Sequence, residues 1–401
     1  MESMFDDEVT HRNNKHLVTF SGEYEEIPPM LTMNNSIQKY DLEEILFAVT
    51  TNTKRIQTTI HYLKFWTNLS NINCLIVFDE MDFVNHTNIT EYLIYEGIPC
   101  AVQTSSVLRY EERYLELFYL AWNKETTVKK YSERKRVQWF AIADDDTIWF
   151  VYNLLRTLEH YNSSNTIYLG NISTKKFQIT QHGDYFAYGG GGILFSRPLA
   201  LLFVQHRQEC KRFLKLYNGD EMIGKCVIEE LKINLTKNKN FHQMDHIGDM
   251  TGLMESGLDG LVSLHHLFKL WQPFPDTNIN KSNETIHRLN IAYTTFNKNF
   301  LKRYLRLNYN TNQSMLLTLG YSVSLFNRIL SHTELSLIEK TWCCDEVVDR
   351  ITRPEETNKT TWYFQRLINK QSTNPIKYEM IYKKKFNIND QYSSLKVTII
   401  N

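Results

Sequence analysis

The stretch WFAIADDDTIWF, residues 139–150, decides the fold of this chain. Its first five residues are all apolar, and three aspartates, Asp144, Asp145 and Asp146, follow them directly. Strands as continuously apolar as this one usually lie in a parallel sheet that helices cover on both faces. Ligands of open α/β sheets bind beyond the carboxyl ends of the strands, where this triplet lies. The stretch therefore predicts an α/β fold with acidic side chains at its ligand-binding edge.

Apolar runs alternate with helical patterns on both sides of this stretch. On the N-terminal side, buried strands are predicted at residues 45–50, 74–80 and 100–106, with helical patterns between them that run through 66 and over 115–122. On the C-terminal side we expect a helix at 148–161, strands at 167–171 and 191–195, and helices at 198–208 and 220–231. This alternation predicts a mostly parallel central sheet.

The pattern changes after about residue 280, where segments typical of antiparallel strands begin. QSMLLTLGYSVSLF (313–326) and YEMIYKKKF (378–386) are the clearest of them. Residues 1–40 are polar and unpatterned. The 401 residues are enough for two or three domains, and we expect a disordered stem at 1–40, an α/β domain at 41–280 and a small β-rich C-terminal appendage at 281–401.

Composition excludes several classes of protein. The 45 basic residues balance the 45 acidic ones, so no net field draws the chain onto nucleic acid or anionic lipid. No run approaches the ~18–20 apolar residues of a membrane helix, and the first thirty residues are too polar for a signal peptide. The six cysteines include no CxxC pair, which disfavours a zinc ribbon but permits disulfides. Glycosylation sequons mildly favour a secretory location, and they include Asn68, Asn88, Asn162, Asn171, Asn234 and Asn283.

The aspartate triplet is the strongest chemical feature of the sequence. Three adjacent carboxylates repel one another, so the site costs stability unless a cation or a loop rich in donors compensates. Mn²⁺ or Mg²⁺, coordinated by carboxylate oxygens and bridging a diphosphate, would fit such a site. An acidic surface loop or the start of a helix would explain the same residues, and position alone does not separate these interpretations.

Three weaker signals follow the triplet. Glycines 189–192 precede an apolar strand, where they either let the backbone approach a ligand or form a bulge. Asp220 and Glu221 begin a predicted helix and either cap it or supply a general base that points into a cleft. In VSLHHL (262–267), alternation along a strand sends His265 and His266 to opposite faces, and a histidine in such a position is more often structural than a ligand.

Taken in order, these blocks resemble the fringe-like, family 31 β-1,3-glycosyltransferases over most of the chain. WFAIADDDTIWFVYNLLRTL is similar to the strand, DDD and helix block of that family, and FAYGGGGILFSRPLA to its glycine-rich block. NGDEMIGKCVIEELKI is similar to its acidic helix start, and VSLHHL to its histidine block. FHQMDHIGDMTGL and LGYSVSLFNRILSHTEL also resemble the fringe-related branch long catalogued as a domain of unknown function.

The resemblance implies a GT-A fold, with a donor half at about 41–147 and an acceptor half at about 148–280. Asp144 and Asp146 match metal-binding positions for Mn²⁺ or Mg²⁺, with His266 as the histidine ligand and His265 as the alternative. The positions at which the family contacts the UDP-sugar correspond here to Thr50, Thr51, Asp79, Asp144, Asp145, Gly190 and Gly191. Lys54 and Arg55 partly represent the basic residues that the family carries after its first strand.

The resemblance also implies the chemistry. Asp220 matches the catalytic base in the register set by Gly224, with Glu221 as the alternative, and Cys210 and Cys226 match positions that form a disulfide. The implied enzyme is an inverting, metal-dependent glycosyltransferase that moves a hexose or N-acetylhexosamine from a UDP-sugar to a hydroxyl of a glycan or glycoprotein, forming a β-1,3 linkage. We expect it in the Golgi lumen as a type II membrane protein, with an N-terminal anchor that this sequence lacks.

Two other functions stay open at the level of sequence. One is a catalytically inactive, sugar-binding or scaffold member of the same fold, which the intact Asp144–Asp146, Asp220 and His266 disfavour. The other is a nucleotidyltransferase with a similar nucleotide-binding half. It is disfavoured because the sequence has no second acidic metal pair and no basic triphosphate loop.

Overall fold

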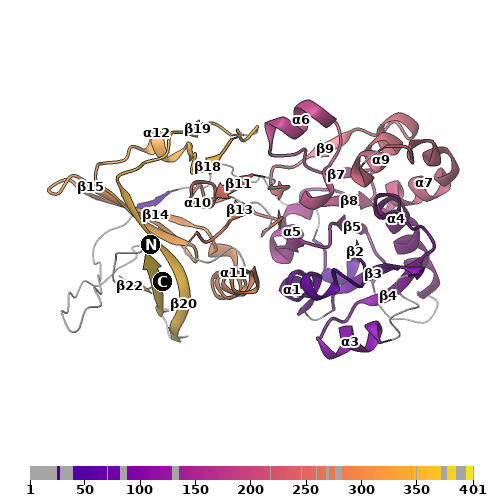
Figure 1. Cartoon of the computed structure of the whole chain (residues 1–401), viewed down its shortest axis with the longest axis horizontal. Helices are drawn as coiled ribbons and strands as arrows, with labels where there is room; N and C mark the ends of the chain where they lie inside the picture. Colours follow the sequence, from indigo (N-terminus) through magenta and orange to yellow (C-terminus); the bar gives the residue numbers. More distant parts are fainter. Residues whose placement is uncertain are drawn as a thin grey trace.

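The computed structural model shows an elongated molecule with two lobes, coloured indigo to pink on the right of Figure 1 and orange to yellow on the left. The residues that it describes are 25–27, 39–69, 71–81, 88–128, 135–216, 218–244, 246–258, 260–267, 271–275, 282–344, 346–348, 350–371, 377–384 and 394–400.

The first lobe is built around a seven-stranded sheet. Its spatial order is β4 (Ala101–Ser105), β3 (Asn73–Asp79), β2 (Ile45–Thr50), β5 (Trp139–Ala143), β8 (Ile193–Ser196), β7 (Tyr168–Gly170) and β9 (Leu235–Lys237). The four strands from β4 to β5 are parallel, and β8 runs antiparallel to both of its neighbours. The mostly parallel central sheet that the sequence predicts is therefore confirmed.

Side chains that alternate along β2 place a layer of helices on each face of this sheet. Phe47 and Val49 pack in one core cluster with α1 (Ile56–Thr67), whereas Leu46 and Ala48 pack in another with α4 (Tyr110–Val128). The other helices of this lobe are α3 (Ile89–Tyr95), α5 (Val151–Leu158), α6 (Lys176–His182), α7 (Arg197–Gln205), α8 (Arg207–Cys210) and α9 (Gly219–Lys225). Both faces are thus covered, as continuous apolar strands require.

Two predicted helices differ in the structure. The helix expected at 148–161 begins only with α5, because Thr147–Trp149 form strand β6, which pairs with β12 (Ser263–His265). This pairing joins segments far apart in the chain, so local periodicity gives no sign of it. The helix expected at 220–231 is α9 followed by a π-helical turn, Cys226–Glu230.

The second lobe is an antiparallel sheet, which confirms the β-rich C-terminal region. Its spatial order is β1 (Glu25–Ile27), β14 (Arg303–Asn308), β15 (Gln313–Thr318), β16 (Ser322–Phe326), β20 (Lys359–Gln371), β21 (Lys377–Lys384) and β22 (Ser394–Ile400). Strand β1 comes from the segment predicted to be a disordered stem, so that prediction is wrong for residues 25–27. Residues 1–24 and 28–38 of the predicted stem lie outside the described residues.

Short elements connect the two lobes. Strand β10 (Phe241–His242) pairs with β12, and β11 (Ile247–Asp249) pairs with β13 (Trp271–Gln272) and β18 (Trp342–Cys343). The remaining short elements are β17 (Ile338–Glu339), β19 (Thr352–Arg353), α10 (Thr251–Glu255) and α12 (His332–Leu335).

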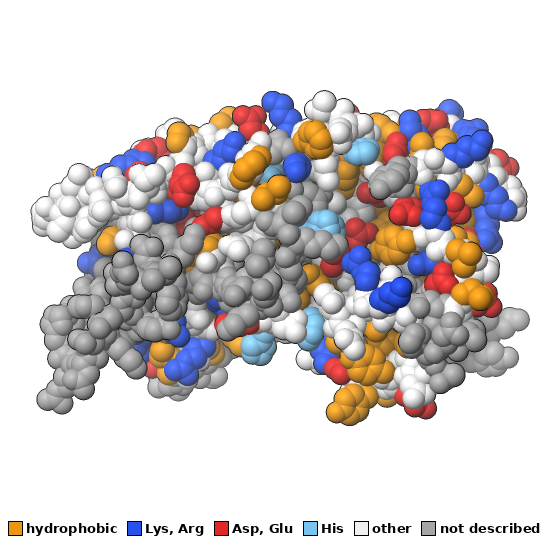
Figure 2. All heavy atoms as spheres, in the orientation of Figure 1, with side chains coloured by type: hydrophobic (Ala, Val, Ile, Leu, Met, Phe, Trp, Pro, Cys, Tyr) orange, Lys and Arg blue, Asp and Glu red, His pale blue; other side chains and the backbone are white. Residues whose placement is uncertain are grey.

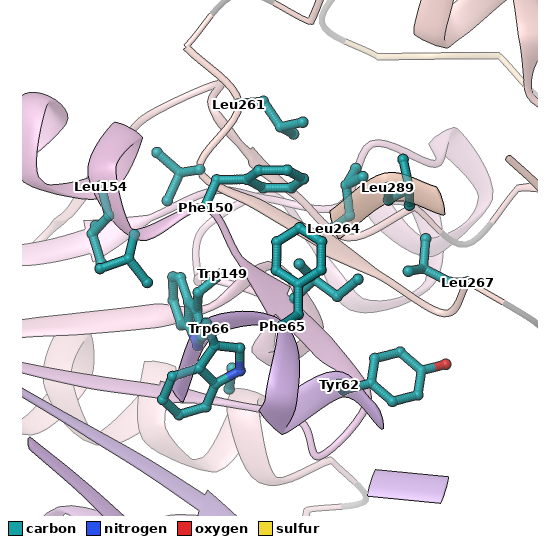
Figure 3. Close-up of a cluster of buried hydrophobic side chains, with 14 of the residues drawn as sticks. Tyr62, Phe65, Trp66, Trp149, Phe150, Leu154, Leu261, Leu264, Leu267 and Leu289 are labelled. Carbon is teal, nitrogen blue, oxygen red and sulfur yellow. The ribbon is translucent and has the colours of Figure 1, made fainter. Parts of the chain in front are cut away.

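Helix α11 (Ser282–Phe296) joins the two lobes through a shared core. The Tyr293 ring stacks on Phe65 of α1 at 5.9 Å and meets the Phe150 ring edge-on at 4.8 Å. In Figure 3, Leu289 lies in the same cluster as Phe65, Trp149 and Phe150. The predicted boundary near residue 280 therefore does not coincide with a break in packing, and the division into domains stays a prediction.

Disulfides link the predicted pair of cysteines and two further pairs. Cys210 and Cys226 are bonded, with their Cα atoms 5.1 Å apart, which agrees with the predicted pairing. The other two bonds are Cys74–Cys100 and Cys343–Cys344. In the part of the chain that the structure describes, no helix combines the length and the apolar composition needed to cross a membrane.

Candidate active site

The aspartate triplet forms the tight turn between β5 and β6. Its three side chains differ in exposure: Asp144 is 28% exposed, Asp146 is 8% exposed and Asp145 is completely buried. Asp144 is therefore partly exposed, whereas Asp145 and Asp146 are both buried.

His265 is held against this turn by the pairing of β12 with β6, in which His265 lies opposite Thr147. Its Nε2 atom lies 3.2 Å from Asp144 Oδ2 and 3.0 Å from Asp146 Oδ1. Its Nδ1 atom lies 3.0 Å from the backbone carbonyl oxygen of Gln243. Burial lowers the pKa of His265, but the Asp146 and Asp144 carboxylates outweigh that effect and raise the pKa well above its usual value.

His266 lies beside the same turn but farther from the carboxylates. Its Nε2 atom is 3.8 Å from Asp146 Oδ2, its ring stacks on that of His265 at 3.7 Å, and its backbone has a positive φ of 57°. Ligand atoms of Asp146, His265 and His266 lie within 4.8 Å of one another. Both candidate histidines therefore reach the triplet, and His265, the alternative in the sequence analysis, makes the closer contacts.

The donor set fits a divalent cation by its chemistry. Carboxylate oxygens and imidazole nitrogens together suit Mn²⁺, which accepts both. When His265 Nδ1 donates its proton to the Gln243 carbonyl, the lone pair of Nε2 points toward the aspartates, which is the usual way in which a metal-binding histidine is oriented. Asp144, Asp146 and His265 are the residues that would hold the ion.

Asp145 serves the interior of the site. Its Oδ2 atom accepts hydrogen bonds from the hydroxyls of Thr51, at 2.6 Å, and Thr59, at 3.1 Å, and its Oδ1 atom forms an ion pair with Arg55. Burial raises the pKa of Asp145 to about 6, against the opposing effects of Arg55 and Thr51. Asp145, which Thr51 helps to hold in place, thus positions Arg55. The Arg55 side chain is 40% exposed and also lies 3.5 Å from Asp146.

Thr50 and Asp79 end neighbouring strands and meet at Arg113. The buried Arg113 guanidinium contacts Asp79 Oδ2 at 2.8 Å and Thr50 Oγ1 at 3.2 Å, and it donates to the carbonyls of Val107 and Leu108. Helix α4, which carries Arg113, thereby fixes the carboxyl ends of β2 and β3. The predicted contacts of Thr50, Thr51 and Asp79 with UDP stay predictions.

The glycines form a buried turn, Gly189–Gly191, wedged between side chains of the site. A Cβ atom on Gly190 would lie 2.1 Å from His265 Nδ1, and one on Gly189 would lie 2.5 Å from the Tyr114 hydroxyl. The Gly191 amide donates to Gln243 Oε1 at 2.9 Å. These close contacts explain the absence of side chains here by packing, and a contact of Gly190 or Gly191 with the donor sugar stays a prediction.

Asp220 lies at the start of α9 and contacts the glycine turn. Its Oδ2 atom accepts the Gly189 amide at 2.8 Å, and its Oδ1 atom accepts the Glu221 amide at 2.8 Å. Burial raises the pKa of Asp220 to about 7, and the negative charge of Asp144 adds to this effect, while the two amide hydrogen bonds oppose it. A carboxylate held in place with a pKa near neutrality is suited to general base catalysis.

Sequence reasoning missed three residues that build this site: Arg113, Tyr114 and Gln243. Arg113 and Tyr114 lie on α4, where they look like ordinary members of an amphipathic helix. Gln243 falls in the FHQMDH segment, which the resemblance singled out without giving this residue a role. Their positions depend on packing between distant elements, and the only local signal is a charged side chain on the buried face of α4.

Family comparisons agree with this geometry. The sequence matches the model of the Fringe-like family over residues 40–269. It also matches, over residues 178–394, the model of a family described as a protein of unknown function, DUF604. Each match covers more than half of the chain.

Curated relatives share shorter segments with the chain. Human chondroitin sulfate synthase 3 is 34% identical over 97 residues, which are 23% of this chain and 11% of that protein. Mouse beta-1,3-glucosyltransferase is 29% identical over 109 residues, covering 27% of this chain and 21% of that protein. Lunatic fringe of Xenopus laevis, a beta-1,3-N-acetylglucosaminyltransferase, is 27% identical over 144 residues, covering 32% and 38%. The chain thus spans well under two thirds of these relatives.

Among solved structures, two of the glycosyltransferase GlyE of Streptococcus pneumoniae are similar at 11% sequence identity. They align with TM-scores of 0.32 and 0.34, over 49% and 62% of this chain and 45% and 60% of theirs. The family models cover more of the sequence than the curated relatives named above. On the strength of those models, the chain belongs to the Fringe-like family, a family of glycosyltransferases.

Proposed function

We propose that this protein is an inverting, metal-dependent glycosyltransferase that uses a UDP-sugar and glycosylates a hydroxyl of a glycan or glycoprotein. One observation carries the proposal: the turn Gly189–Gly191 contacts both groups, because its Gly189 amide donates to the carboxylate of Asp220 and its Gly190 packs against His265, which meets Asp144 and Asp146. A candidate base and a candidate cation site thus contact the same turn of backbone.

The donor side of the site would hold the diphosphate. Asp144, Asp146 and His265 would bind Mn²⁺ or Mg²⁺, and the ion, when bound, would neutralise the charge that develops on the leaving diphosphate. Arg55 presents a second positive charge beside the same carboxylates, and Asp145 fixes its position. Without the ion pair to Asp145, the Arg55 side chain would be flexible and less preorganised toward the leaving group.

The acceptor side of the site would supply the base. Asp220 takes the proton of the acceptor hydroxyl while the oxygen of that hydroxyl attacks the anomeric carbon, on the face opposite the UDP. The amides of Gly189 and Glu221 hold both carboxylate oxygens, so the side chain is oriented before the substrate arrives. A single displacement of this kind inverts the configuration of the donor, so an α-linked UDP-sugar yields a β-linked product.

The relatives support the class of donor, product and location. Those named beta-1,3-glucosyltransferase and beta-1,3-N-acetylglucosaminyltransferase transfer a hexose and an N-acetylhexosamine, respectively. We propose a β-1,3 product from one of these two types of UDP-sugar, and residence in the lumen of the Golgi, the compartment in which the fringe-like family acts. The three disulfides are compatible with an oxidising compartment.

The deciding experiment measures UDP release from a panel of UDP-sugars, with Mn²⁺ and with EDTA, in the presence of simple glycoside acceptors. We expect release from one or a few donors, dependence on the metal, and a β-linked product by NMR. Binding of a UDP-sugar without release or transfer would favour the inactive, sugar-binding alternative. Absence of any UDP-sugar binding would contradict both.

A further inference from the structure

A cavity of about 350 Å³ lies between α1, the segment after α3, and α11. This volume is at the lower end of the range of small-ligand pockets, ~300–1,000 Å³. The residues that line it from α1 are His61, Lys64 and Phe65, in the C-terminal half of the helix, whereas Arg55 of the candidate active site immediately precedes the helix. The cavity is therefore separate from the candidate active site.

The walls of this cavity are polar and electrically balanced. Lys64 forms an ion pair with Glu96 across the cavity. Burial, and then the charge of Lys64, lower the pKa of His61, which leaves its imidazole neutral at neutral pH. The ring of Phe65 and the side chain of Ile286 provide apolar surface. Such a lining suits an uncharged, amphiphilic ring such as a pyranose, which has an apolar C–H face and a rim of hydroxyls.

Two asparagines of glycosylation sequons lie on this cavity: Asn68, after α1, and Asn283, in the first turn of α11. Both side chains are exposed. The Asn283 sequon, Asn283-Glu284-Thr285, carries threonine and is fully described. Figure 2 shows histidine side chains at the lower edge of the molecule, where Figure 1 places α1, α3 and α11.

We propose that Asn283 carries an N-linked glycan whose first N-acetylglucosamine packs in this cavity. In the modification, the Asn283 amide nitrogen bonds to the anomeric carbon of a lipid-linked oligosaccharide diphosphate. The lipid diphosphate leaves, and the amide loses one proton. Thr285 is only 4% exposed in the folded chain, so the transfer precedes folding. The inference rests on the secretory location given in the proposed function.

The position of Asn283 gives this glycan a structural role. Helix α11 belongs to the C-terminal region, whereas α1 belongs to the first lobe, and the cavity lies where they face each other. A sugar attached to α11 and packed on His61 and Phe65 would add contacts across this junction. By contrast, Asn171 is buried and donates its side-chain amide to the Phe241 carbonyl, so a chain that carried a glycan there could not adopt this fold, and the folded protein should hold an unmodified Asn171.

The test uses the full chain, directed into the secretory pathway of mammalian cells by an added N-terminal signal peptide. Peptide mapping after release of N-glycans in H₂¹⁸O is expected to show ¹⁸O-labelled aspartate at position 283 and unmodified asparagine at 171. Enzymatic release of all N-glycans should lower the melting temperature by about 1–3 °C. Enzymatic trimming that leaves one N-acetylglucosamine on each site should preserve the melting temperature, because the first sugar makes the proposed contacts.

Matched variants show whether the glycan stabilises the protein by packing in the cavity or only by being attached to the chain. In His61→Ala and in Asn290→Ala, which remove cavity contacts but keep the sequon, glycan release should no longer shift the melting temperature. Asn234→Gln, which removes an exposed sequon away from this cavity, should leave the shift as in wild type. Unmodified Asn283, or an equal shift in the cavity variants, would overturn the inference. If the protein gave either of these results and still released UDP from a UDP-sugar, the proposed function would stand and this inference would be wrong.

Discussion

Three aspartates that are adjacent in sequence become chemically distinct in the folded chain. Asp145 is completely buried against Thr51, Thr59 and Arg55, whereas the carboxylates of Asp144 and Asp146 both meet His265. At the scale of single residues, then, Asp145 bonds to neighbouring side chains of the protein, whereas Asp144 and Asp146 can bind an ion.

For the cation, we expect His265→Ala to weaken Mn²⁺ binding by at least about 10–100-fold. His266→Ala should have a much smaller effect, because its Nε2 atom is 3.8 Å from the nearest aspartate oxygen, compared with 3.0 Å for His265. Titration calorimetry with Mn²⁺, and the gain in melting temperature with Mn²⁺ plus UDP, measure both. A larger loss in His266→Ala would restore the assignment that the sequence resemblance gave.

For the base, Asp220→Asn should lower turnover by roughly 10²- to 10⁴-fold while UDP-sugar binding is retained. Asparagine keeps the shape of the side chain and can still accept the Gly189 amide, but it cannot take a proton. Glu221→Gln is the matched control and should stay near wild type. If Glu221→Gln lost turnover while Asp220→Asn did not, the base would be Glu221 rather than Asp220.

Stability should respond to pH through Asp220. Its pKa rises from 3.8 to about 7 on folding, because of burial and then the charge of Asp144. The folded protein therefore holds a proton that the unfolded chain releases, and its free energy of unfolding falls as pH rises from about 4 to about 7. Relative to wild type, metal-free Asp220→Asn should thus gain about 4 kcal/mol over this interval and no more above it.

Urea unfolding of both proteins at several pH values between 4 and 8 measures this difference. The other ionisable groups that interact with Asp220 include Asp144, Glu221, Tyr114 and Tyr168, and they are the same in the two proteins. A difference that stayed constant across this range would show that Asp220 ionises as easily in the folded protein as in the unfolded chain.

At the scale of elements, the turn Gly189–Gly191 sets the distance between base and cation site. Gly190→Ala would place a Cβ atom 2.1 Å from His265 Nδ1, so the imidazole must move away from the Gln243 carbonyl that orients it. Mn²⁺ affinity should fall by about 10–100-fold. The measurement is the same Mn²⁺ titration.

Gly191→Ala is the control for this prediction. Its added Cβ atom would meet nothing closer than the Gln243 amide nitrogen at 3.4 Å, which is ordinary contact, so Mn²⁺ affinity should change little. Equal losses in the two variants would mean that the turn as a whole, rather than the contact with His265, supports the ion.

At the scale of the whole molecule, buried charges tie the short elements α10 and β17 to the C-terminal sheet. Lys359 of β20 reaches Glu339 Oε1 of β17 at 2.8 Å and Glu255 Oε2 of α10 at 3.3 Å, and all three side chains are less than 10% exposed. The hydroxyls of Ser322 and Ser324 also donate to Glu255. Because both carboxylates share one lysine, the lysine holds the short elements between the lobes to the C-terminal sheet.

Lys359→Met should lower the free energy of unfolding by about 3–5 kcal/mol, since it leaves the buried Glu255 carboxylate without its cation and Glu339 with only Arg353. Urea unfolding at pH 7 measures this loss. Lys298→Met, which changes an exposed lysine after α11, should change stability by less than about 0.5 kcal/mol. Similar losses in the two variants would show that Lys359 in its buried network contributes no more to the free energy of unfolding than an exposed lysine does.

The sequence by itself determined the elements whose pattern is local. Continuous apolar runs predicted β2, β3, β4 and β5, the alternation after residue 280 predicted the antiparallel sheet, and the order of acidic, glycine and histidine blocks led to the family. Each of these signals is carried by neighbouring residues, because burial on two faces or on one face fixes the period of hydrophobicity within a few positions.

Only the tertiary structure decided which of the candidate side chains meet. The pairing of β6 with β12 replaced the start of a predicted helix and placed His265 opposite Thr147, nearer to the aspartates than His266. The same folding turned Asp145 inward, brought Arg113 to Thr50 and Asp79, and packed α11 into the core of the first lobe. The register between distant strands and the packing between lobes are set by contacts across the whole chain, and no local pattern records them.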